Sequence, residues 1–175
     1  MTVVVRARRD STFVSRRCTA IAAAVVNTRS SRAVPPDPSI LWRNTMSYAF
    51  GVEIDHPFDA TVERVVAALA AEHLGIVSDV DVAAILSKKL NEDIGGYRIL
   101  GACAPGLASR VIRSRPSAGA LLPCNVVVRQ VSPSRTAVDF MDPVPVLALV
   151  EDAVADQVAA EAHAILQRVA TALKA

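Results

Sequence analysis

Apolar and polar residues alternate regularly from residue 47 onward. In residues 48–54 every second side chain is apolar, which is the period of a half-buried β-strand. Other segments are apolar runs bounded by turn residues, which also predict strands. The predicted strands are residues 48–54, 76–80, 97–103, 121–131 and 136–141. In the fourth, Cys124, Val126 and Val128 are expected to face the core, and Asn125 and Arg129 the opposite side.

The segments between the strands predict helices. Asp59 is expected to cap a first helix, with His73 at the edge of its buried stripe and Gly75 ending it in a left-handed conformation. Asp79 or Asp81 is expected to cap the second helix. The remaining predicted helices cover residues 82–90, 105–115 and 146–173. The last is predicted to be continuous, with a valine stripe along one side.

These elements predict one α+β domain over residues 46–175. Residues 1–45 have a different composition, rich in Arg and Ser, and end in a proline segment at residues 35–38. We expect them to form a disordered tail. Two interpretations stay open: the tail is a targeting or nucleic-acid-binding arm, or Met46 is the true initiator and the tail is not translated.

Charge separates the same two regions. Residues 1–45 contain eight Arg and two acidic residues, whereas residues 46–175 contain eleven basic and fifteen acidic residues. A net acidic domain does not attract a phosphate backbone as a whole, so nucleic acid is not an expected partner. The longest apolar stretch of the N-terminal region, Ala20–Val26, is far too short to span a bilayer, and no membrane association is expected.

The cysteines indicate the compartment and one candidate site. Cys18, Cys103 and Cys124 lack the close spacing of zinc ligands, and their odd number disfavours a disulfide framework. We therefore expect no metal site and a reducing, cytoplasmic location. Cys103 and Cys124 flank a helix that carries Arg110 and Arg113.

Cations and a helix N-terminus can lower the pKa of a thiol, which would make Cys103 and Cys124 a redox or nucleophilic site. Alternatively, both cysteines occupy core-facing strand positions and act as small hydrophobic residues. We expect the two thiols at the same edge and on the same side of an antiparallel pair of strands, with Cα atoms within about 12 Å but no disulfide. No histidine lies close to either cysteine in sequence.

Two blocks of sequence resemble a known family. They are Tyr97-Arg98-Ile99-Leu100-Gly101-Ala102-Cys103-Ala104-Pro105 and Leu121-Leu122-Pro123-Cys124-Asn125-Val126-Val127-Val128. Together with Asp81, Lys89 and Asp142-Pro143, they resemble the domain of unknown function DUF302 over Met46 to about Pro143. The resemblance implies a twisted, mainly antiparallel sheet with helices on one face, and no established activity. Ala104 stands where the family commonly has Asn.

Three functions remain open, and the sequence identifies neither a catalytic residue nor a cofactor. The first is a small-ligand binding or sensing module with its pocket between the sheet and the helices. The second is a thiol-dependent redox protein that uses Cys103 and Cys124. The third is a structural or dimerising domain, whose interface would be the exposed part of the C-terminal helix. Whether the protein is an enzyme stays open.

Overall fold

Five strands form one antiparallel sheet in the computed structural model, which describes residues 48–175. The strands are β1 (Ala49–Ile54), β2 (Gly75–Asp81), β3 (Tyr97–Cys103), β4 (Cys124–Ser132) and β5 (Arg135–Met141). They lie in the order β1-β5-β4-β3-β2, and each neighbouring pair is antiparallel. The predicted α+β fold with an antiparallel sheet is confirmed. The expectations for residues 1–45 lie outside the described residues.

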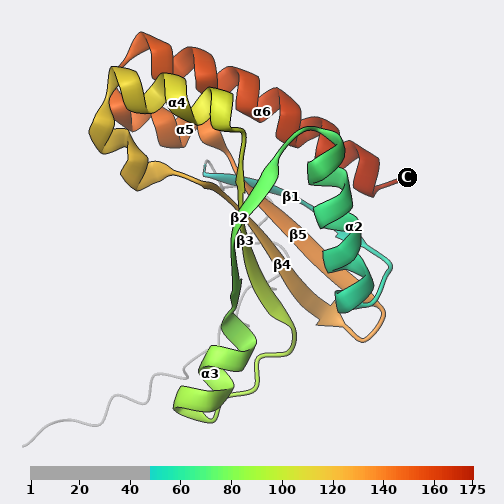
Figure 1. Ribbon diagram of the computed structural model, residues 1–175. Helices are drawn as coiled ribbons and strands as arrows, with labels where there is room; N and C mark the ends of the chain where they lie inside the picture. Colours follow the sequence, from blue (N-terminus) through green and yellow to red (C-terminus); the bar gives the residue numbers. More distant parts are fainter. Residues whose placement is uncertain (1–47) are drawn as a thin grey trace, which may run out of the picture. The chain divides into compact units, whose positions relative to one another are not determined.

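Among residues 48–175, five α-helices accompany the sheet (Figure 1). They are α2 (Phe58–Ala71), α3 (Val82–Leu90), α4 (Pro105–Ser114), α5 (Pro143–Leu147) and α6 (Ala153–Leu173), with short 3-10 helices η1 (Pro116–Leu121) and η2 (Ala148–Val150). α2 and α6 pack on the sheet, α4 and α5 pack on α6, and α3 lies apart from the other helices (Figure 1). Within the described part of the chain, no helix has the length and apolarity needed to cross a membrane.

The side chains along each strand alternate between the two faces of the sheet, and those on the helix side form the core. The inward side chains in the middle of β4 and β5 are fully buried, as predicted for Val126 and Val128, and they pack against apolar stripes of α2 and α6. The most deeply buried members of this cluster are Val126, Val128, Val138, Phe140, Val65, Leu69, Leu166 and Val169. A second cluster joins α4, α5 and α6 around Val111, Leu147 and Val158. The space between the sheet and the helices is therefore filled by side chains.

Three helix details differ from the predictions. Asp59 does not cap α2; the helix begins after Pro57 without a side-chain cap. Gly75 does not end it, because His73 adopts the left-handed conformation at φ 60° and Gly75 already belongs to β2. His73 is consequently exposed beyond the helix rather than placed at the edge of its buried stripe.

The predicted continuous C-terminal helix is divided. η2 follows α5, Glu151 has a left-handed φ of 53°, and α6 begins only after Asp152. The Asp152 carboxylate accepts hydrogen bonds from the backbone N–H groups of Val154, at 2.9 Å, and Ala155, at 3.1 Å. A side chain that caps a helix in this way competes with continuation of the preceding turn. The apolar stripe of α6 itself is buried as predicted.

The strand predicted from Leu121 begins later. Leu121 belongs to η1, and β4 starts at Cys124. Pro123 has no N–H to donate to a ladder, which explains why the strand does not extend towards η1. The predicted helix at 105–115 is confirmed, with Pro105 in its first turn and Pro116 beyond its end.

Candidate functional site

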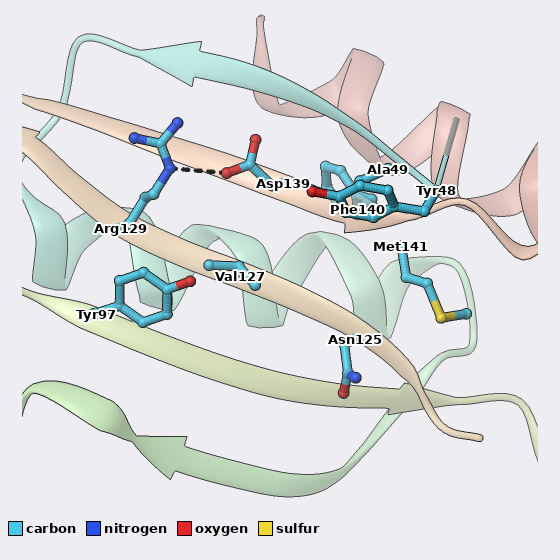
Figure 2. Close-up of a pocket in the computed structure, with 9 residues that line it drawn as sticks. All are labelled: Tyr48, Ala49, Tyr97, Asn125, Val127, Arg129, Asp139, Phe140 and Met141. Atoms are coloured by element: carbon cyan, nitrogen blue, oxygen red, sulfur yellow. Dashed lines mark hydrogen bonds and ion pairs between the residues drawn. The ribbon is translucent and has the colours of Figure 1, made fainter. Parts of the chain in front are cut away.

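The face of the sheet opposite the helices carries a hollow of about 440 Å³ (Figure 2). Its lining comes from β1, β3, β4 and β5, together with the residue that precedes β1. The lining residues are Tyr48, Ala49, Tyr97, Asn125, Val127, Arg129, Asp139, Phe140 and Met141. The alternation that buries Val126 and Val128 necessarily turns Asn125, Val127 and Arg129 to this opposite face.

The pairing register of the strands determines which residues lie at each end of the hollow. Ala49 pairs with Met141, and Tyr97 pairs with Arg129. Figure 2 shows Tyr48 and Met141 at one end and Tyr97 with Arg129 at the other, with the Tyr97 hydroxyl pointing towards Val127. The Tyr48 ring reaches over Phe140 towards Asp139, so both tyrosine hydroxyls point into the hollow (Figure 2).

An ion pair crosses the neighbouring strands β4 and β5. Arg129 Nε donates to Asp139 Oδ2 at 2.9 Å, and the two side chains are 35% and 19% exposed. Gly51 on β1 leaves room for the carboxylate: a Cβ at this position would overlap Asp139 and lie 2.9 Å from the Val138 carbonyl oxygen. The close approach of Asp139 to the β1 backbone thus depends on the absence of a side chain at residue 51.

These groups are suited to holding a molecule. The hollow offers apolar contact from Val127 and Met141, aromatic contact from Tyr48 and Tyr97, and polar groups from Asn125 and the ion pair. Mixed linings of this kind, mostly apolar with a few polar groups, are typical of small-molecule sites. Among residues 48–175 there is no group of three or more His, Cys, Asp or Glu that could hold a metal ion.

The two predicted thiol residues lie near each other. β3 and β4 are antiparallel neighbours, and Cys124 pairs with Ala102, next to Cys103. This register corresponds to a Cα separation of about 6 to 7 Å, within the predicted limit. Both cysteines are free and half-buried, and both border a cavity of about 30 Å³ next to α4.

Cys103 is not among the residues that pack against the core cluster of the sheet. Leu100 and Ala102 are the residues of β3 that pack in the core, and Cys124 packs there beside Ala102. Cys103 is the last residue of β3 and borders the same small cavity as Cys124. That both thiols share one side of the sheet stays a prediction.

The environment of Cys124 does not favour a reactive thiolate. Burial and, to a smaller extent, the nearby Cys103 raise the pKa of Cys124 from its ordinary 9.0 to about 11. Arg110 instead forms an ion pair at 2.8 Å with Glu161 of α6, and Arg113 is exposed in the last turn of α4. The structure does not gather the two arginines and two cysteines into one site.

The family-pattern residues are distributed over the domain. Asp81 caps α3 by accepting from the Ala84 N–H at 2.8 Å, and Lys89 is exposed in the last turn of the same helix. Pro105 opens α4, and Pro123 precedes β4. Asp142 caps α5.

The Asp142 carboxylate accepts from the Val144 N–H at 3.0 Å and contacts His163 Nδ1 at 2.9 Å. Of all the family-pattern residues, Tyr97 and Asn125 are the two that line the hollow.

Sequence reasoning missed most of the hollow. Alternation did place Asn125 and Arg129 together on the outer face of their strand, and the same alternation along residues 136–141 would have placed Asp139 and Met141 on one face. Their proximity to Tyr48 and Tyr97, however, follows from the strand order, which the sequence pattern does not contain.

The chain matches a family model described as "Domain of unknown function DUF302" over residues 50–173. The match extends beyond the stretch to which the resemblance was assigned, so α6 is part of the family domain. A similar solved structure is described as that of an uncharacterized conserved protein DUF302 from Bacillus stearothermophilus. It has 23% identity and a TM-score of 0.67, and the similarity covers 73% of this chain and 99% of that one.

No curated protein matches the chain. The structural likeness supports the fold, and the family model covers well over half of the 175 residues. The chain therefore belongs to the DUF302 family.

Proposed function

We propose that this domain binds a small molecule in the hollow on the face of its sheet that α2 and α6 do not cover. The observation that carries the proposal is the lining of this face. An uncovered antiparallel face is ordinarily polar, yet here Ala49, Val127, Tyr97 and Met141 surround a hollow of about 440 Å³. That volume lies within the range of small-molecule sites.

The ligand site proposed here differs from the one expected from the sequence. The cavity that Cys103 and Cys124 border measures about 30 Å³, which is room for about one or two water molecules. A ligand between sheet and helices would have to displace packed core residues. The outer hollow requires no such displacement.

A neutral aromatic probe tests the proposal. N-phenyl-1-naphthylamine fluoresces more strongly in an apolar site, so wild-type protein should give saturable enhancement. Val127→Phe fills the middle of the hollow and should weaken binding about tenfold or more, equivalent to about 1.4 kcal/mol. Val77→Phe makes the same change on β2, outside the hollow, where Val77 is 63% exposed, and should leave binding unchanged.

Melting curves of the three proteins verify that each remains folded. Native mass spectrometry of the purified wild-type protein would reveal any molecule that it retains. Absence of saturable probe binding by the wild type, or equal affinity in Val127→Phe, would contradict the proposal.

A further inference from the structure

α3 differs from the other α-helices of residues 48–175 because none of its nine residues is buried. Ile85 on α3 and Val80 on the preceding strand are 43% and 39% exposed. With Ala84 they border an open hollow of about 480 Å³. A helix of this length is marginal without tertiary packing, and α3 lacks the packing that stabilises α2 and α6.

Charges of opposite sign lie at the two ends of this surface. Asp79 and Asp81 border the hollow at the N-terminal end of α3, whereas Lys88 and Lys89 border it at the C-terminal end. Ile85 lies between them, and spacings of three and four residues keep it on the same side of the helix as Asp81 and the lysines. The sequence along this side is therefore acidic, apolar, then basic.

We propose that α3 packs antiparallel against α3 of a second copy of this chain, around a two-fold axis. A two-fold interface needs a surface that complements itself. In the antiparallel arrangement the Ile85 side chains of both copies meet near the axis, and Asp81 of each copy faces Lys88 and Lys89 of the other. The interaction would bury the side of α3 that is exposed in a single copy.

The adjacent edge of the sheet does not offer an equivalent contact. β2 is an edge strand, but its pairing with β3 is interrupted by a register shift between Ile76 and Ser78, and it carries Asp79 and Asp81. Bulges and charges on an edge strand disfavour pairing with another strand. Helix packing through α3 is therefore the contact that this end of the molecule favours.

Sedimentation velocity of the full chain over a range of concentrations tests the interface. The wild type should form a dimer, and Ile85→Glu should raise the dimer dissociation constant at least about tenfold by placing a charge at the axis. Leu149→Glu is the control, because Leu149 is 74% exposed in η2, far along the chain from α3. It should leave the dissociation constant unchanged.

A milder variant separates the charge contribution from folding. Asp81→Asn keeps a residue that can cap α3 while removing the charge, and should raise the dissociation constant a few-fold and reduce its dependence on salt. Glu92→Gln is the matched control, since Glu92 is exposed but does not border the hollow. A wild type that stays monomeric at every concentration, or a dimer unaffected by both Ile85→Glu and Asp81→Asn, would overturn the proposal.

Discussion

His73 has a left-handed backbone conformation, with φ at 60°. This conformation is unfavourable for residues other than glycine, because the Cβ atom lies too close to the backbone. It closes α2: its N–H bonds the Ala70 carbonyl at 3.0 Å, and the Leu74 N–H bonds the Leu69 carbonyl at 2.9 Å. This pattern is the Schellman motif, in which glycine usually occupies the left-handed position.

His73→Gly should therefore stabilise the domain by about 1 kcal/mol, because it relieves the left-handed conformation without removing a buried side chain. Denaturant unfolding measures the change. Ala71→Gly is the matched control within the helix and should destabilise by a similar amount. Equal destabilisation by both variants would show that residue 73 does not carry this strain.

The buried thiol of Cys124 predicts a pH dependence. Because its folded pKa of about 11 exceeds its ordinary 9.0, the folded state retains the proton more strongly than the unfolded state. This contribution is complete below pH 9 and is lost as the pH rises towards 11, up to about 2 to 3 kcal/mol. The free energy of unfolding of Cys124→Ala should therefore fall less steeply than that of the wild type over this range.

Cys103→Ala, which changes the neighbouring thiol outside the core, serves as the comparison. Parallel pH profiles for the wild type and Cys124→Ala would contradict the assigned burial. Slow alkylation of Cys124 in the native protein and rapid alkylation in denaturant would agree with it.

The sequence predicted which face of the sheet a residue occupies, but not which residues of other strands it contacts. The pleat placed Val126 and Val128 inwards and Arg129 outwards, because alternation is a property of the single strand. That Asp139 would meet Arg129 depends on pairing between β4 and β5, and the room for it depends on Gly51 in the distant β1. Such contacts depend on the register of three strands.

The buried stripe of α6 explains why the helix is part of the core rather than an exposed interface. Val158 and Val169 are 3% and 0% exposed, and Leu166 is 1% exposed. Val154, at the start of the same stripe, is half-buried. None of the exposed large hydrophobic residues among 48–175 lies on α6. The dimer surface expected on the exposed part of this helix stays a prediction.

Val169→Asp should destabilise the domain by several kcal/mol, since an unpaired carboxylate would enter the core. Gln167→Asp, on the exposed side of the same helix, should change the free energy of unfolding by about 0.5 kcal/mol or less. Thermal and urea unfolding compare the two. A tolerated Val169→Asp would mean that α6 is not anchored on the sheet.

Periodicity predicted which segments are helical better than where they end. α3 and α4 matched their predicted ranges closely, because Asp81 caps one and prolines bound the other. The break at Asp152 was missed because the valine spacing continues on both sides of it. The spacing of apolar residues carries no information about a capping carboxylate, which competes with continuation of the preceding helical turn.

At the scale of the whole domain, the α+β class followed from the pattern, but the strand order did not. The strand order β1-β5-β4-β3-β2 brings four strands together around the outer hollow and leaves β2 at the edge beside α3. The proposed ligand site and the proposed dimer surface consequently use different residues, and each experiment can succeed or fail independently of the other.

The position of β1 also has a consequence for how the chain is made. β1 contains the first residues of the sheet, yet its partner is β5, the last strand, with Ala49 opposite Met141. During synthesis the ribosome therefore delivers β1 long before its partner exists, whereas β4 and β5 emerge together and can close locally. Contacts between such distant segments slow folding, so completion of the sheet must await nearly the entire nascent domain.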